Sequence, residues 1–224
     1  MKPELHRFGQ SRQPVVTVDG ITGAPGAAVA IAAALAPSPL SRTYYPGLRR
    51  IVTEADIAAY AYVCRLLEAA APFIGGGFGA DSFALVEASF SIVTAAPDAL
   101  IPAQRAPHFD SADPRDVALL HYLADTPGSG TAFYRQRSTG IELVDDANRD
   151  TFVAAAKAES GSLSGYTDGS NAHFDQIGRI EAVPDRLVIY RGALLHSGII
   201  PNGMKFSADP RQGRLTANLF VRIQ

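Results

Sequence analysis

Residues 107–135 read PHFDSADPRDVALLHYLADTPGSGTAFYR, and this stretch decides the fold class. It opens with a His-x-Asp motif, His108 and Asp110, and continues with two short apolar runs, Val117–Ala124 and Thr131–Arg135. The turn sequence TPGSG separates the two runs. Short apolar runs bounded by Gly, Pro and Ser are typical of β-strands joined by tight turns. The stretch therefore predicts a β-rich domain with a polar motif placed just before a strand.

The rest of the second half has the same texture. Three further runs predict strands, at Arg186–Arg191, Leu194–Ile200 and Arg214–Ile223, and one run predicts the clear helix of this half, Asn148–Glu159. Many short strands with few helices favour a jelly-roll barrel, the cupin-like double-stranded β-helix. We assign the core of this barrel to residues 101–224.

The first hundred residues mix helix and strand patterns. The strand patterns are Val15–Val18 and Ser82–Ala95, the latter as one strand or a hairpin, and the helix pattern is Thr53–Ala71. The Pro- and Gly-rich segment Pro72–Gly79 is expected to end that helix. We expect residues 1–100 to form an N-terminal α/β layer with helices that support the barrel, within a single domain of residues 1–224. The fold class is thus mainly β with flanking helices (α+β).

Composition narrows the function classes. Hydrophobic residues make up 47% and charged residues 19%, as in an ordinary globular protein. A formal charge of −2 and the lack of any Lys/Arg run argue against nucleic acid and anionic membranes as partners. The single cysteine, Cys64, allows neither an internal disulfide nor a thiolate zinc site. The N-terminus lacks the apolar core of a signal peptide, so we expect a cytoplasmic protein. Oligomeric state has no signal in the sequence.

Two His-x-Asp motifs occur, His108-Phe109-Asp110 and His173-Phe174-Asp175. On an extended segment the two side chains of such a motif share one face, because side chains alternate along a strand. With a second histidine they form the facial triad of non-haem Fe(II) enzymes, which leaves coordination positions open. The first motif precedes a set of strands, with His196 far downstream. The second lies only about twenty residues before His196, and its role stays open.

The order of these elements resembles the Fe(II)/2-oxoglutarate-dependent oxygenase superfamily, particularly its prolyl-hydroxylase-like branch. The resemblance covers Pro107 to Gln224. It implies that Fe(II) is bound by His108, Asp110 and His196. It also implies that Arg214 and Thr216 bind the far carboxylate of 2-oxoglutarate, with Tyr122 as a further contact. Asn218 continues the strand face of Thr216, and Arg211 competes with Arg214 for the carboxylate.

The implied activity is hydroxylation of a small molecule or a peptide side chain, with succinate and CO2 as coproducts. A cupin-like metal enzyme or sensor that does not use 2-oxoglutarate is the alternative, and a degenerate barrel that only binds a ligand is a third possibility. Fold alone does not separate these classes, because the chemistry belongs to the site. Titration with 2-oxoglutarate in the presence of metal distinguishes them.

Overall fold

The computed structural model describes residues 1–224 as ten β-strands and four α-helices. In chain order these are β1 (Lys2–Phe8), β2 (Gln13–Asp19), α1 (Pro25–Ala34), β3 (Gly47–Ile51), α2 (Ile57–Phe78), β4 (Phe83–Val93), α3 (Pro102–Arg105), β5 (Asp116–Tyr122), β6 (Gly130–Gln136), α4 (Arg149–Glu159), β7 (Phe174–Glu181), β8 (Arg186–Arg191), β9 (His196–Ile199) and β10 (Leu215–Ile223). The strand patterns of the second half are confirmed to within a few residues. The run Ser82–Ala95 forms one strand, β4, rather than a hairpin.

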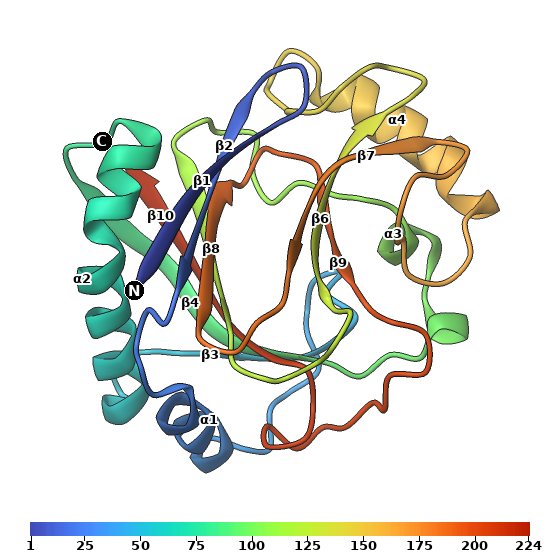
Figure 1. The fold of residues 1–224 in the computed structure, drawn as a ribbon. Helices are drawn as coiled ribbons and strands as arrows, with labels where there is room; N and C mark the ends of the chain where they lie inside the picture. The colour runs from blue at the N-terminus through green and yellow to red at the C-terminus, as the bar shows by residue number, and fades with distance from the viewer.

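The strands form two antiparallel sheets that face each other (Figure 1). The large sheet has the order β1-β2-β8-β5-β10-β4-β3, and the small sheet has the order β7-β6-β9. The backbone of His108 forms an isolated bridge with His196 at the free edge of β9. Four strands of the large sheet, β8-β5-β10-β4, thus face four extended segments of the small sheet. This arrangement is the predicted double-stranded β-helix.

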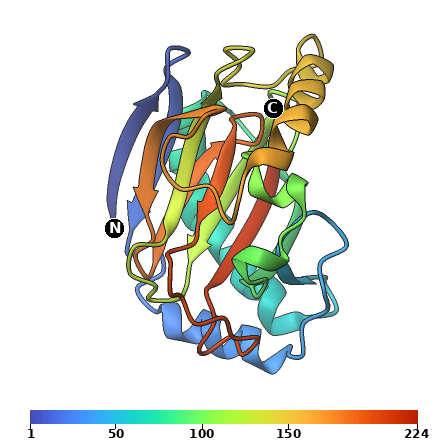
Figure 2. The same ribbon diagram turned by 90° about the vertical axis from the view of Figure 1, so that its right-hand side faces the viewer.

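Helices cover the outer faces of both sheets. Figure 1 shows α1 and α2 against the large sheet, and Figure 2 shows α4 beside the strands of the small sheet. The largest apolar core lies between α1, α2 and the large sheet, and smaller cores lie between the sheets and under α4. Along β10, Ala217, Leu219 and Val221 join the core under α2, while Thr216, Asn218 and Phe220 line a cavity between the sheets. This strand therefore carries both the core and the cavity wall.

Helix α2 runs beyond its expected end. Instead of ending the helix, Pro72–Gly79 continues it to Phe78, and Gly79 terminates it in the left-handed conformation with φ of 68°. A Cβ at Gly77 would approach Val16 to 2.7 Å, so this glycine lets the helix pack directly on β2. Tertiary packing thus outweighs the unfavourable helix propensities of Pro and Gly. By length and composition alone α2 also passes for a membrane-spanning helix, and its apolar stripe is used here against the sheet.

The first hundred residues contribute more than a supporting layer. Strands β1 to β4 belong to the large sheet, and β4 pairs with β10 over nine residue pairs, from Phe83 to Ile92. The sequence patterns did not indicate helix α1 or the edge strands β1, β3 and β7, in which most residues are exposed or only partly buried. Edge strands of this kind lack the apolar alternation that identifies buried strands.

Candidate metal centre and its cavity

The structure brings His108, Asp110 and His196 together at the mouth of the barrel. Nε2 of His108 lies 4.0 Å from Oδ1 of Asp110, and Nε2 of His196 lies 3.4 Å from Oδ2 of the same carboxylate. All three potential ligand atoms are within 4.8 Å of one another. Two imidazoles and one carboxylate at this spacing fit a single divalent ion such as Fe(II), with positions left for other ligands.

The neighbours of His196 prepare it for metal binding. Its Nδ1 lies 2.8 Å from the carbonyl oxygen of Leu194, which can only accept, so Nδ1 carries the proton and Nε2 is free to bind a metal. Burial lowers the pKa of His196 to about 4, so the ring is neutral at pH 7. Burial raises the pKa of Asp110, while the charges of His108 and Arg49 act in the opposite direction. A metal ion would favour the ionised carboxylate.

The main chain fixes the three ligands relative to one another. The amide of His108 donates to the carbonyl of His196 at 2.9 Å, and the amide of His196 donates back at 2.8 Å. The amide of Asp110 donates to the carbonyl of Gly192 at 2.7 Å. A Cβ on Gly192 would lie 3.4 Å from the Cβ of Asp110, so the two backbone segments are in close contact here. Backbone hydrogen bonds therefore place the motif before any metal binds.

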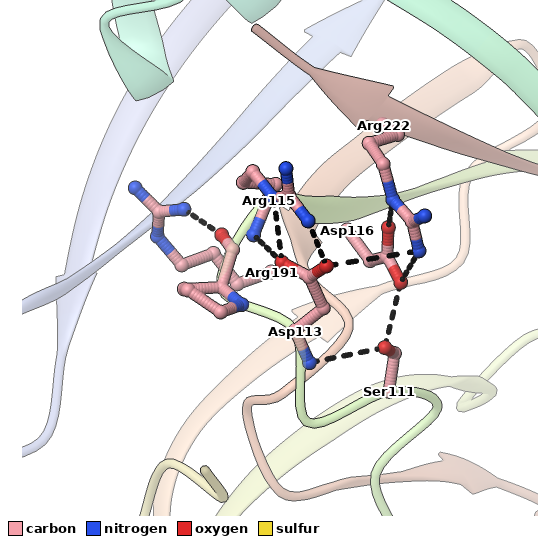
Figure 3. A network of polar contacts seen from close by, with 7 residues as sticks. Ser111, Asp113, Arg115, Asp116, Arg191 and Arg222 are labelled. Atoms are coloured by element: carbon pink, nitrogen blue, oxygen red, sulfur yellow. Dashed lines mark hydrogen bonds and ion pairs between the residues drawn. The ribbon is translucent and has the colours of Figure 1, made fainter. Parts of the chain in front are cut away.

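A polar network holds the loop that follows Asp110 (Figure 3). Ser111 donates its hydroxyl to Asp116 at 2.6 Å, and the amide of Asp113 donates to that hydroxyl at 3.1 Å. Arg222 grips Asp116 with two hydrogen bonds of 2.8 and 2.9 Å. Arg191 donates to the Pro114 carbonyl in the same network. Hydrogen bonds through Asp116 thereby connect the loop to Arg222 at the end of β10. The loop residue that takes part, Ser111, directly follows Asp110.

Replacing the carboxylate at the centre of this network, in Asp116→Ala, is expected to weaken metal binding. The hydrogen bonds to Ser111 and Arg222 are lost, so the backbone beside Asp110 is no longer fixed. Loss of a group that bonds a metal-ligating side chain weakens metal affinity roughly 10- to 100-fold, and Asp116 acts one residue farther away, so we expect a decrease of roughly 10-fold or less. Metal titration followed by calorimetry measures the change. Arg115→Ala, which removes an exposed ion pair with Asp113, is the matched control and should leave metal affinity unchanged.

Arg214 lies immediately before β10 and is 7% exposed. Its Nε donates to the Ser129 hydroxyl at 2.6 Å and its Nη2 to the Gly130 carbonyl at 3.0 Å. These bonds orient the guanidinium and leave Nη1 without a protein acceptor. Arg214 and the buried Thr216 both line the cavity that holds the three side chains of the candidate metal centre. A buried, oriented arginine with free N–H groups is suited to bind a carboxylate.

The cavity has a volume of about 610 Å³ and opens between the two sheets. Tyr45, from the segment before β3, also lines it, and the hydroxyl of Tyr45 is buried without a hydrogen-bond partner. Burial raises the pKa of Tyr45 to about 12, against the opposing charges of Arg214 and Arg49 and the nearby Thr216 hydroxyl, which lies outside hydrogen-bonding geometry. The hydroxyl is therefore protonated at neutral pH and available as a donor near Arg214. An orphaned donor in a cavity requires a ligand or water as its partner.

Tyr122 occupies a different position from the other expected site residues. It is buried, does not line the cavity, and shares a 2.6 Å hydrogen bond between its hydroxyl and that of Thr131. The guanidinium carbon of Arg214 lies 5.9 Å from the centre of the Tyr122 ring. Tyr122 thus packs beside Arg214, while Thr131 is the residue of this pair that reaches the cavity wall.

The structure separates the competing residues from the centre. Arg211 has a side chain that is 65% exposed, lies 3.9 Å from Asp209 and does not line the cavity. His173 shares a 2.7 Å hydrogen bond with Ser162 instead of approaching a second metal ligand. Asp175 forms ion pairs with Arg135 and Arg137. The second His-x-Asp motif is accounted for by these surface contacts.

Sequence reasoning missed three residues at the site, Tyr45, Arg49 and Ser129. Tyr45 and Arg49 come from the part of the chain that was expected only to support the barrel, and they reach the cavity because β3 pairs with β4. Ser129 lies in the turn TPGSG, which was noted only as a turn. The run Tyr44-Tyr45-Pro46 lies outside any strand or helix pattern, and such connecting segments often carry binding residues.

The burial of His196 predicts a pH dependence of stability in the metal-free protein. Below pH 6.5 the unfolded chain protonates this histidine, whereas the folded protein resists protonation down to about pH 4. The free energy of unfolding should therefore decrease as the pH falls through this window, by about 3 kcal/mol from this group at most. The His196→Asn variant should show a shallower dependence between pH 6.5 and 4 in urea unfolding. Parallel curves for the two proteins would contradict this assignment.

Two solved structures are similar to this fold. HygX from Streptomyces hygroscopicus, solved with nickel and 2-oxoglutarate bound, matches with a TM-score of 0.53 and 15% identity, over 95% of this chain and 84% of that one. The non-haem α-ketoglutarate-dependent epimerase SnoN from nogalamycin biosynthesis matches with a TM-score of 0.52 and 14% identity, over 95% and 79%. At such identities the likeness shows a shared fold, and it confirms the double-stranded β-helix. No curated protein matches the sequence significantly. A family model does match residues 1–221, so the chain belongs to the DUF6445 family, a family of unknown function.

Proposed function

We propose that this protein is a non-haem Fe(II)- and 2-oxoglutarate-dependent oxygenase that hydroxylates a small molecule or a peptide side chain. The observation that carries the proposal is the placement of a two-histidine, one-carboxylate triad and an oriented, buried arginine in one cavity. The fold shared with HygX and SnoN supports the same conclusion. A metal site alone would suit the cupin-like alternative equally well. Arg214 favours the oxygenase, because a buried, oriented arginine is suited to bind the far carboxylate of 2-oxoglutarate.

The residues present fit both groups. His108, Asp110 and His196 would hold Fe(II), and Arg214, Thr216 and the unpartnered hydroxyl of Tyr45 would hold the far carboxylate of 2-oxoglutarate. When bound, iron and 2-oxoglutarate use O2 to convert a C–H bond of the substrate into C–OH, releasing succinate and CO2. The protein supplies binding, orientation and electrostatics, as in other cofactor-dependent enzymes.

The chain contributes in two ways. Asp110 and two neutral histidines provide one negative charge, which partly balances a divalent ion and leaves the centre able to accept an anionic cosubstrate. Arg214 balances the other end of that cosubstrate, and its bonds to Ser129 and the Gly130 carbonyl keep it from relaxing toward the metal. Two fixed charges at opposite ends select a dicarboxylate of matching length.

Anaerobic addition of Fe(II) with and without 2-oxoglutarate tests the proposal. We expect a visible absorption band that requires both additions, because a ketoacid chelated to Fe(II) gives a charge-transfer transition. Oxygen admission should then convert 2-oxoglutarate to succinate. Tight metal binding with no band at any 2-oxoglutarate concentration would favour the cupin-like alternative. If the protein binds no metal, the remaining interpretation is a degenerate barrel that only binds a ligand.

A further inference from the structure

A second polar cluster lies in the same cavity, on the wall formed by the large sheet. Arg49 of β3 donates from Nη2 to the carboxylate of Glu87 at 2.6 Å and from Nε to the Ser89 hydroxyl at 3.1 Å. Its guanidinium also lies over the ring of Phe220, 5.6 Å from the centre. The Arg49 side chain is only 15% exposed, so it is held in one orientation. Arginines fixed in this way in a concave site are suited to bind an anion.

The cluster has unused hydrogen-bonding capacity on three groups. Nη1 of Arg49 and Oε2 of Glu87 have no protein partners, and 40% of the Glu87 side chain is exposed. Asn218 binds Ser91 through one amide atom at 3.3 Å, and its other amide atom is buried without a partner. All three residues line the cavity. A free cationic donor, a free anionic acceptor and an unpaired amide therefore meet in one space.

The register of the large sheet places Glu87 of this cluster in line with a residue that packs against the metal centre. Glu87 pairs with Phe220, Phe220 with Ala118, and Ala118 with Tyr190. The ring of Tyr190 in turn packs against His196, with centres 4.8 Å apart. Arg49 itself pairs with Ser91, which pairs with Thr216, so the backbone of Arg49 is level with the expected cosubstrate site and its side chain reaches along the sheet to Glu87.

We propose that the Arg49–Glu87 cluster binds the α-carboxylate and α-ammonium groups of a free amino acid, which is the substrate class of this site. The carboxylate would bind Arg49, the ammonium would bind Glu87, and Asn218 would contribute a further hydrogen bond. This inference rests on the proposed function, because it assigns the substrate of that same centre. The side chain of the bound amino acid would then be the part of the substrate nearest the metal ligands.

The charges of the cluster favour a zwitterion over other ligands. Arg49 and Glu87 together carry no net charge, so a simple anion would meet the repulsion of Glu87 and a simple cation that of Arg49. A ligand with both charges satisfies both side chains at once. A blocked peptide lacks these charges and would forgo the charge-assisted hydrogen bonds, which are about twice as strong as neutral ones.

Calorimetric titration of the Ni(II)- and 2-oxoglutarate-loaded protein tests the proposal, because nickel prevents turnover. The probes are the twenty standard L-amino acids at up to about 10 mM, which reveals dissociation constants in the millimolar range. The best binder is then compared with its N-acetyl and carboxamide forms. We expect loss of either charge to weaken binding roughly 10- to 100-fold. Arg49→Gln and Glu87→Gln should each weaken the zwitterion by a similar factor.

Matched variants make the result specific. In Arg49→Gln the carboxamide probe should bind about as well as the zwitterion, because the partner of the carboxylate is gone. Arg49→Lys keeps the charge and should retain part of the affinity. Arg50→Gln is the control: its side chain binds Asp56 on the other face of β3 and should leave binding unchanged. Thermal unfolding of each variant verifies that it is folded.

Three results would overturn the proposal: no amino acid binds, the blocked forms bind as tightly as the zwitterion, or Arg49→Gln leaves the affinity unchanged. The second result would identify a peptide as the ligand. Each of these is compatible with an intact Fe(II)- and 2-oxoglutarate-dependent absorption band, whereas loss of that band overturns the proposed function instead. In that case the titration is run on the metal-free protein, because the cluster contains no metal ligand.

Discussion

The His196→Ala variant is expected to lose Fe(II) binding, with a decrease in affinity larger than the roughly 10- to 100-fold typical of removing an outer partner of a metal ligand. His196 is the ligand whose tautomer is set by Leu194 and whose ring is buried against Tyr190. Only one imidazole and one carboxylate would remain. The visible band with 2-oxoglutarate should disappear with the metal.

Competition with a metal indicator under anaerobic conditions measures this affinity. The matched control is His173→Ala, which removes the histidine of the other His-x-Asp motif and its hydrogen bond with Ser162. That variant should bind Fe(II) as the unchanged protein does. Circular dichroism verifies that both variants are folded. Retention of Fe(II) binding by His196→Ala would contradict the assignment of His196 to the proposed triad.

The Arg214→Ala variant is expected to require roughly 100-fold more 2-oxoglutarate to develop the absorption band, because charge-assisted hydrogen bonds contribute about 1.5–3 kcal/mol each. Arg214 is buried, and its orientation by Ser129 leaves N–H groups free in the cavity. Fe(II) affinity without 2-oxoglutarate should change little, because Arg214 is not a metal ligand. The two affinities thus separate the cosubstrate site from the metal site.

Arg211→Ala serves as the control for this experiment. Arg211 lies only three positions away in the sequence, is largely exposed and does not line the cavity. Its removal should leave the 2-oxoglutarate concentration at half-maximal absorbance unchanged. The reverse pattern, with Arg211→Ala impaired and Arg214→Ala normal, would show that the loop rearranges to present Arg211 to the cosubstrate.

Much of the barrel follows from local patterns. Strands β5, β6, β8 and β10 are short apolar runs between turn residues, and each was placed by its own sequence. The choice of His108, Asp110 and His196 as ligands came from the resemblance to the oxygenase superfamily, whereas the His-x-Asp motif itself was recognised by residue type and spacing. Such features depend on neighbours within a few residues, because side chains of an extended segment alternate with a period of two.

Other features depend on contacts that no local pattern contains. Helix α2 continues through Pro72 because its apolar face packs on the sheet and Gly77 allows close contact with Val16. Composition does not distinguish the two His-x-Asp motifs, since the tripeptides are identical, and the sequence favoured the first motif only through the elements that follow it. The structure distinguishes them by their neighbours: one motif meets His196, and the other meets Ser162 and two arginines.

The sequence by itself determined the fold class, and its resemblance to the oxygenase superfamily predicted His108, Asp110, His196 and Arg214 as site residues. Only the tertiary structure placed Tyr45, Arg49 and Glu87 in the same cavity. Strand β3 pairs with β4 and β4 pairs with β10, which brings the first hundred residues into the barrel wall. Local sequence specifies which face of a strand a side chain occupies. Long-range strand pairing specifies which other side chains share that face, and this decides what the cavity can bind.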